Sequence, residues 1–378
     1  MLGSASELCD ALCNLPLTMA DYPPHSGEKI FLVCSAEDFP AAHDYLQTQK
    51  VEIAAICLFD RPDRSCCPDT ISDGTSVVPL DALASFPDAR PLLFSSDYFS
   101  VPVHSGSGCL AARALAARTA SFSLVPKLEH TEWHARAFPD LYKRFGKQLD
   151  TVYTRLADTE SRLAFAQAVK MLLTGNPGYV RPAPFDQYFH PATQVLPGDI
   201  VVDGGTHSIQ ETLHFARVAQ EKGMVLCFEP EPALFAALRE TAGNLPEKLT
   251  VRPLPFALGA ESFSCFIVSN DAGSWVTRRP REGALPVTMR DLDSVLCEEN
   301  IDHVDVIKLD IEGCEVDALR GAAECIRRDR PRLMISAYHK MDDIIAIPEL
   351  LWSLVPEYTL HFACHEMLVG EFLYYAHV

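Results

Sequence analysis

The sequence lacks an excess of positive charge and a long apolar run. Its 378 residues carry 32 Lys and Arg against 51 Asp and Glu, which gives a formal net charge of −19. Nucleic acids and anionic membranes bind basic surfaces, so this balance argues against either as the main partner. The longest apolar run near the start, residues 53–59, is too short to cross a bilayer. We therefore expect neither a nucleic-acid nor a membrane partner.

The sequence also lacks an ordered set of cysteines. Its 13 cysteines are an odd number without framework spacing, and residues 1–17 lack the basic and apolar stretches of a secretory signal. Reduced thiols and a cytoplasmic protein are the expectation. Cys9 with Cys13, and Cys66 with Cys67, are not followed by a second pair of Cys or His at ligand spacing. We assign no metal ligands.

Glycine is missing where a dinucleotide-binding domain needs it. Residues 29–34, 51–59 and 90–96 read as strands with helical sequence between them, which predicts a small βαβ layer. The first turn, CSAEDF (34–39), has no glycine to let a pyrophosphate approach. Residues 1–120 are therefore predicted to be a small Rossmann-like α/β domain that does not bind NAD, and that packs, forms a homodimer or presents substrate.

A second α/β domain is predicted over 191–378, after a helical linker at 121–190. Its expected parallel strands are 199–205, 224–232, 248–254, 304–310 and 331–338, and the strand-like pieces 358–364 and 370–378 close the chain. Helical sequence separates most of these strands. This order predicts a doubly wound sheet with a final antiparallel strand pair.

Polar residues stand at the ends of four of these strands. Asp203 comes after the first, Glu229 after the second, Asp310 and Glu312 after the fourth, and His339 after the fifth. In a doubly wound sheet, ligands bind outside the carboxyl ends of the strands, where the strand order reverses. Each acid by itself can be a helix cap. The set favours a ligand site, because an acid on the strand after a glycine turn suits a ribose diol.

Four segments resemble the FkbM family of S-adenosylmethionine-dependent methyltransferases: DIVVDGGTHSIQETLHFA (199–216), CFEPEP (227–232), VIKLDIEGCEVDALRGA (306–322) and RPRLMISAYHKMDDIIAIPELL (330–351). The family's most distinctive string, Lys-x-Asp-x-Glu-Gly-x-Glu, is matched by Lys308, Asp310, Glu312, Gly313 and Glu315. The resemblance covers about 150–378, including DTESRLAFAQAVKMLLTGN and QYFHP before the first motif. It implies the fold of a class I methyltransferase.

The resemblance also implies a cofactor and its contacts. S-adenosylmethionine is the expected cofactor, with Asp203, Gly205 and Thr206 along its methionine and ribose part. Glu229 is expected to hold the ribose hydroxyls, and Ala257 to lie near the adenine.

The acceptor side is expected at the end of the fourth strand. The resemblance implies that Asp310 and Glu312 face the methyl group and the acceptor, a hydroxyl of a sugar, glycan or related metabolite. Of the candidate bases, His339 is favoured by its unperturbed pKa near 6.5. Asp310 or Glu312 can serve if burial raises the pKa, and acids packed together can also attract a divalent cation. Lys308 lies in an apolar strand and is expected to snorkel or pair with an acid.

Two other functions stay open. A nicotinamide-dependent oxidoreductase or epimerase uses the same glycine turn and Glu229, but it predicts a G-x-G-x-x-G turn and a Tyr-x-x-x-Lys pair, and the chain has neither. A non-catalytic, methyltransferase-like scaffold is favoured by Ile209, which stands where the family's first motif usually has a glycine.

Overall fold

The structure is a computed structural model. It describes residues 6–15, 19–20, 26–36, 39–58, 74–95, 122–126, 138–174, 177–206, 209–246, 249–270, 273–366 and 371–378. The chain divides into two compact units, Met1–Gly146 with Leu163–Phe185 and Ala363–Gly370, and Lys147–Arg162 with Asp186–Phe362 and Glu371–Val378. Each unit therefore combines separate stretches of sequence. The expected boundary at 120 lies outside the described residues, and the one at 190 stays a prediction.

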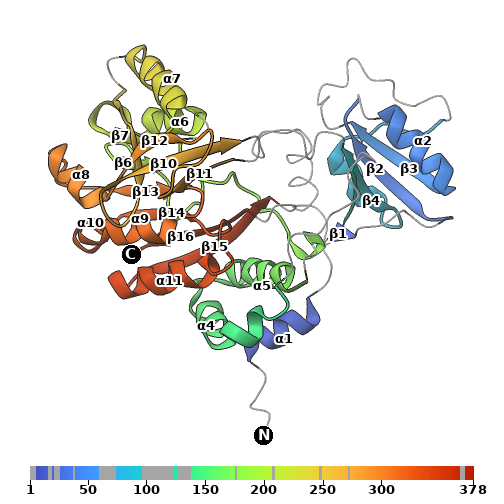
Figure 1. The fold of residues 1–378 in the computed structure, drawn as a ribbon. Helices are drawn as coiled ribbons and strands as arrows, with labels where there is room; N and C mark the ends of the chain where they lie inside the picture. Colours follow the sequence, from blue (N-terminus) through green and yellow to red (C-terminus); the bar gives the residue numbers. More distant parts are fainter. Residues whose placement is uncertain are drawn as a thin grey trace, which may run out of the picture. The chain divides into compact units, whose positions relative to one another are not determined.

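The first unit is built on a parallel sheet with the order β1-β5-β4-β2-β3 (Figure 1). Its strands are β1 (Met19–Ala20), β2 (Lys29–Cys34), β3 (Glu52–Leu58), β4 (Arg90–Ser95) and β5 (Phe122–Pro126), with helices α1 (Glu7–Asn14) and α2 (Phe39–Gln49) and the 3₁₀ turn η2 (Leu80–Ser85). Leu46 of α2 packs on Ile30, Leu32 and Leu92 of the sheet. The three strands expected in this part of the chain are confirmed.

The second unit is built on a seven-stranded sheet with the order β15-β16-β14-β13-β6-β7-β8. Its strands are β6 (Ile200–Gly204), β7 (Met224–Phe228), β8 (Val251–Leu254), β13 (Val306–Leu309), β14 (Arg332–Ser336), β15 (Thr359–Glu366) and β16 (Glu371–His377). Five adjacent strands of this sheet, β14, β13, β6, β7 and β8, are parallel, and β16 runs antiparallel to β14. The predicted doubly wound sheet with an antiparallel strand at its end is confirmed.

The middle of this sheet is buried because helices cover it. All four residues of β13 are buried, as expected of a parallel strand with both faces covered. The helices after β6 are α6 (Ile209–Ala219), α7 (Pro232–Gly243), α8 (Leu292–Glu298), α9 (Glu315–Gly321), α10 (Ala323–Asp329) and α11 (Asp343–Leu354). Earlier in the chain come α4 (Leu141–Arg155) and α5 (Thr159–Thr174). The 3₁₀ turns are η3 (Pro177–Tyr179) and η4 (Gln220–Lys222). Helices α8 to α11 pack against one another, whereas α6 packs on β6 and β7.

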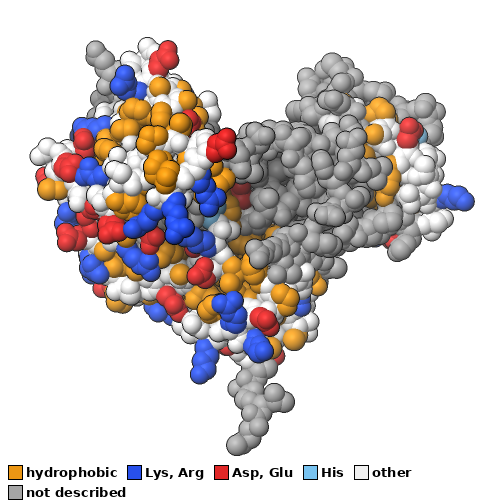
Figure 2. Space-filling model, viewed as in Figure 1, with side chains coloured by type: hydrophobic (Ala, Val, Ile, Leu, Met, Phe, Trp, Pro, Cys, Tyr) orange, Lys and Arg blue, Asp and Glu red, His pale blue; other side chains and the backbone are white. Residues whose placement is uncertain are grey.

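A smaller sheet holds the residues between β8 and α8. It has the order β11-β10-β12-β9 and comprises β9 (Phe256–Leu258), β10 (Phe263–Asn270), β11 (Gly273–Thr277) and β12 (Leu285–Arg290). Strands β10 and β11 form an antiparallel pair within it. Figure 2 shows acidic and basic side chains interspersed over α8, α10 and α11, so many of the acids are ordinary surface. Among the described residues, no helix is long and apolar enough to cross a membrane.

Candidate active site

The candidate site lies where the strand order of the large sheet reverses, between β6 and β13. The chain runs outward from β6 through β7 to β8, and outward on the other side from β13 to β14. The glycine turn after β6 and the acids after β13 meet here: the Asp310 N–H donates to the Gly204 carbonyl at 3.0 Å. A Cβ on Gly205, whose φ is +83°, would lie 1.7 Å from the Asp310 carbonyl oxygen. Only glycine fits this close approach.

Asp203 is buried below the glycine turn. One of its carboxylate oxygens accepts a hydrogen bond from the Thr212 hydroxyl at 2.6 Å, and the other lies 3.1 Å from Lys308 Nζ. The expected pairing of Lys308 with an acid is confirmed. Both oxygens of Asp203 therefore have partners within the protein, and its contact with a cofactor stays a prediction.

Glu229 and Thr206 present groups that fit a ribose and an amino acid. Glu229 follows β7, and its Oε1 accepts the Glu231 N–H at 2.8 Å. Burial is the main reason that the pKa of Glu229 is raised to about 7. The Thr206 hydroxyl is buried and finds no hydrogen-bond partner among the described residues. A bound molecule with hydroxyl and amino groups satisfies both.

Ala257, expected near the adenine, lies in β9 and is buried. It packs against Cys265 and Met289 of the smaller sheet. Ile209, where the family's motif has a glycine, is the first residue of α6. Both placements leave their predicted relation to a cofactor untested.

Asp310 lies directly after β13 and accepts hydrogen bonds from two tyrosines. The Tyr188 hydroxyl donates to Oδ2 at 2.5 Å and the Tyr338 hydroxyl to Oδ1 at 3.1 Å. Burial alone raises the pKa of Asp310, but the charges of His339 and Lys308, with the Tyr188 hydrogen bond, lower it below its ordinary value. Sequence reasoning missed Tyr188. The only available signal was its place in QYFHP, ahead of the first motif.

His339 is held among three carboxylates. Its Nδ1 lies 2.9 Å from Glu315 Oε1, and its Nε2 lies 3.5 Å from Asp310 Oδ1 and 3.6 Å from Glu312 Oε2. Burial lowers the pKa of His339, but the hydrogen bond to Glu315 and the three negative charges outweigh it and raise the pKa to about 9. The ordinary value near 6.5 that favoured His339 as the base is therefore not kept in the fold, and its role as a base stays a prediction. At neutral pH the ring is an imidazolium, because the carboxylates favour its charged form.

The three acids of the family string occupy different environments. Glu312 has a left-handed backbone, with φ +55°, and its side chain is 50% exposed. Glu315 is fully buried at the start of α9 and accepts the Ile311 N–H at 2.8 Å. Asp310, Glu315 and His339 each place a ligand atom within 4.8 Å of the other two, a spacing that a metal ion can bridge. The hydrogen-bonded imidazolium accounts for the same contacts.

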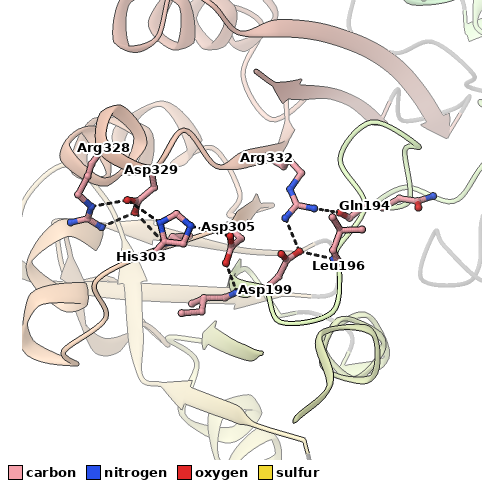
Figure 3. Close-up of polar contacts among 10 residues, drawn as sticks. Gln194, Leu196, Asp199, His303, Asp305, Arg328, Asp329 and Arg332 are labelled. Atoms are coloured by element: carbon pink, nitrogen blue, oxygen red, sulfur yellow. Dashed lines mark hydrogen bonds and ion pairs between the residues drawn. The ribbon is translucent and has the colours of Figure 1, made fainter. Parts of the chain in front are cut away.

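A second polar cluster lies at the other end of the strands, where β13 and β14 begin (Figure 3). His303 lies 3.0 Å from Asp305 and 3.2 Å from Asp329, and Arg332 pairs with Asp199 at 2.7 Å. A cavity of about 340 Å³ there is lined by His303, Asp305, Asp329, Arg330, Arg332 and His377, among others. No sequence motif pointed to this cluster. Its acids also accept main-chain N–H groups, as expected of structural contacts.

Comparison with known proteins identifies the same region of the chain. Residues 202–360 match the methyltransferase FkbM domain. The 2-O-methyltransferase NoeI of Sinorhizobium fredii is 25% identical over 150 residues, covering 35% of this chain and 61% of that protein. The hexuronic acid methyltransferase AglP of Haloferax volcanii is 27% identical over 130 residues, covering 34% of this chain and 50% of that protein. The chain therefore spans less than two thirds of these curated relatives.

A solved structure extends the similarity of the fold to both units. The methyltransferase FkbM of Methylobacillus flagellatus superposes with a TM-score of 0.54 at 19% identity, over 98% of this chain and 97% of that one. The large sheet, with its reversal between β6 and β13, is the Rossmann-like sheet of class I methyltransferases. From the matched domain and the two relatives together, residues 202–360 form a methyltransferase FkbM domain, and the fold agrees with this.

Proposed function

We propose that the chain binds S-adenosylmethionine at the glycine turn after β6 and transfers its methyl group to a hydroxyl of a sugar or glycan. One observation carries this proposal: the glycine turn and the acid-rich turn after β13 are in main-chain contact at the switch point of the sheet. Groups suited to the cofactor and groups suited to an acceptor therefore lie side by side. Such an edge is where doubly wound sheets bind their ligands.

The cofactor half of the site is assigned to Gly205, Thr206 and Glu229. Gly205 lets the glycine turn lie against the main chain of Asp310, and the Thr206 hydroxyl lacks a partner among the described residues. The Glu229 carboxylate can accept both hydroxyls of a ribose, which favours its charged form. Asp203 is assigned a different role, because its oxygens are already held by Thr212 and Lys308. It stabilises the turn.

The acceptor half of the site is assigned to Asp310, Glu312 and His339. When bound, S-adenosylmethionine supplies an electrophilic methyl group. The protein must hold the acceptor oxygen in line and receive its proton, and alignment alone can account for much of the acceleration. The carboxylates raise the pKa of His339 to about 9, which favours the imidazolium at neutral pH, so the role of base is not assigned to it. It acts instead as a hydrogen-bond donor that fixes the carboxylates.

The proton of the acceptor is assigned to a carboxylate. Asp310 lies beside the glycine turn, and its tyrosine donors hold it in one orientation. Its lowered pKa makes it a weak base, so it contributes mainly by orienting the hydroxyl. Glu312 is half-exposed and is the group that can pass a proton to solvent.

The acceptor class is proposed from the relatives. One is named a 2-O-methyltransferase and the other a hexuronic acid methyltransferase, and each matches about a third of this chain. The first name gives methyl transfer to an oxygen and the second gives a sugar acid as the acceptor, and we combine the two as a sugar hydroxyl. The negative charge of this chain, −19, favours a neutral sugar over a polyanionic one.

Calorimetric titration tests the cofactor, and labelled methyl transfer tests the acceptor. We expect S-adenosylmethionine to bind and NAD not to bind, and labelled methyl to appear on a member of a panel of free sugars and nucleotide sugars. Binding of NAD alone would replace the proposal with an oxidoreductase. Binding of neither would leave the non-catalytic scaffold.

A further inference from the structure

Lys308 is a buried lysine in the middle of a central strand. Its side chain is 4% exposed, and a buried ammonium group is unfavourable unless it is fully paired. Among the described residues, its hydrogen-bond and ion-pair partners are on β6 and the turn after it. Nζ donates to the Gly205 carbonyl at 2.7 Å and the Gly204 carbonyl at 3.2 Å, and it pairs with Asp203 at 3.1 Å. The ammonium therefore fixes the main chain of the glycine turn.

The ring of Tyr188 also contacts this ammonium group. Nζ of Lys308 lies 4.9 Å from the centre of the Tyr188 ring, a cation–π distance. The hydroxyl of the same tyrosine donates to Asp310 Oδ2 at 2.5 Å. The position of Tyr188 is secured by its neighbour, because the Gln187 carbonyl accepts a hydrogen bond from the Tyr375 hydroxyl of β16. The Tyr188 side chain thus contacts both Lys308, which holds the glycine turn, and the Asp310 carboxylate.

The charges around Lys308 are balanced within this group. Burial alone lowers the pKa of Lys308, but Asp203 and then Asp310 outweigh it and raise the pKa. The lysine therefore stays charged throughout the pH range in which the protein would work. A permanent cation holds the two carbonyl oxygens and the Asp203 carboxylate more strongly than a neutral amine would, and an apolar side chain could not hold them.

We propose that Lys308 and Tyr188 are positioning residues that hold the glycine turn in its cofactor-binding geometry and orient Asp310 toward the acceptor. The inference rests on the proposed function and adds two residues that contact neither cofactor nor acceptor. Lys308 acts on cofactor binding through the carbonyl groups of Gly204 and Gly205. Tyr188 acts on turnover through Asp310.

Two variants separate these roles. Tyr188→Phe keeps the ring over Lys308 and removes only the hydroxyl, so affinity for S-adenosylmethionine should change less than about twofold. Turnover should fall about tenfold, as expected for loss of one hydrogen bond to a charged group. The acid limb of the pH–turnover profile should move to higher pH, because Asp310 loses a donor that lowers its pKa. A purely structural role of Tyr188 would not move that limb.

Lys308→Met should weaken binding of S-adenosylmethionine by at least about thirtyfold, since it frees two carbonyls and leaves Asp203 unpaired. This variant can also fail to fold. The double variant Lys308→Met with Asp203→Asn removes the unpaired charge and should fold while still binding weakly. Tyr358→Phe is the matched control: it also deletes a buried hydroxyl, one that donates to the Pro331 carbonyl at 2.8 Å. It should lower the Tm and leave affinity and turnover unchanged.

The outcomes distinguish the two proposals. Wild-type affinity in a folded double variant, or an unchanged pH profile in Tyr188→Phe, would overturn the positioning roles while leaving the methyltransferase in place. Failure of the wild-type chain to bind S-adenosylmethionine would overturn the proposed function and this inference with it.

Discussion

Two histidines, at opposite ends of the central strands of the large sheet, each lie between carboxylates. His303 precedes β13 and lies between Asp305 and Asp329, whereas His339 follows β14 and lies among the acids of the family string. Burial lowers the pKa of each ring, and the carboxylates raise it by more. A raised pKa therefore does not by itself distinguish a functional site from a structural contact.

The surroundings of the two histidines make the distinction. The carboxylates beside His303 are already occupied: Asp305 accepts the Ile200 N–H, and Asp329 accepts the Val304 N–H and two bonds from Arg328 (Figure 3). The His303 side chain is 53% exposed, whereas that of His339 is 9% exposed. The first cluster ties together the starts of neighbouring strands. The second buries its charges next to a glycine turn, where they can act on a bound molecule.

Replacing one carboxylate at each end of β13 by its amide should give the largest difference in turnover. Asp310→Asn should lower turnover by roughly 10²-fold or more, the lower range for loss of a positioned catalytic group. Affinity for S-adenosylmethionine should change less than about threefold, because Asp310 faces the acceptor. Asp305→Asn is the matched control at the other end of the strand and should keep full turnover. Labelled methyl transfer measures both, and equal losses in the two variants would contradict the assignment of the site.

The sequence predicts which strand ends meet, but not how their side chains are paired. Parallel strands place their carboxyl ends at one edge, so the proximity of Asp203, Glu229 and Asp310 follows from their place in the pattern. Tyr188 could not be found in the same way, because it lies outside any strand or helix and reaches Asp310 only through the tertiary fold. Likewise, the pKa of His339 depends on distances to three carboxylates that no spacing fixes.

A substitution of Glu229 tests whether its buried carboxylate serves cofactor binding rather than the stability of the fold. Its folded-state pKa of about 7 lies above the ordinary 4.5, so stability is lost as the pH rises from 4.5 through 7. Glu229→Gln should remove this loss and stabilise the protein at pH 8, by on the order of 2–3 kcal/mol at most. It should also weaken binding of S-adenosylmethionine by about tenfold or more. Thermal unfolding at pH 5 and pH 8, with titration of the cofactor, measures both effects.

The contrary result for Glu229 is a variant that binds the cofactor normally. A loss of stability at pH 8 would likewise show that the carboxylate is paired in the folded protein and is not reserved for a ligand. Glu231→Gln serves as the control, because Glu231 caps α7 next to the site and is less buried than Glu229.

The charge state of His339 predicts how the stability and the turnover of the protein depend on pH. Because its pKa is raised from 6.5 to about 9, its contribution to stability is complete below pH 6.5 and is lost as the pH rises through about 9. The stability difference between wild type and His339→Gln should therefore shrink by on the order of 2 kcal/mol between pH 6 and pH 10. Turnover of the wild type should be level from pH 7 to pH 8. A tenfold rise in turnover over that unit would instead identify neutral His339 as the base.

His303 should give the smallest effect and so define the other end of the comparison. Its pKa is also raised, so its contribution has the same sign and is lost as the pH rises above 6.5. Because half of the side chain faces solvent, water and salt screen its ion pairs, and His303→Gln should lower stability by no more than about 1 kcal/mol. That loss should diminish in 0.5 M salt, where the Debye length is only a few ångströms, whereas the effect of His339→Gln should persist because its ion pairs are buried. Turnover and cofactor affinity should be unchanged in His303→Gln. A fall in turnover in His303→Gln would mean that the two ends of the strands are functionally linked, and burial would no longer explain which histidine belongs to the site.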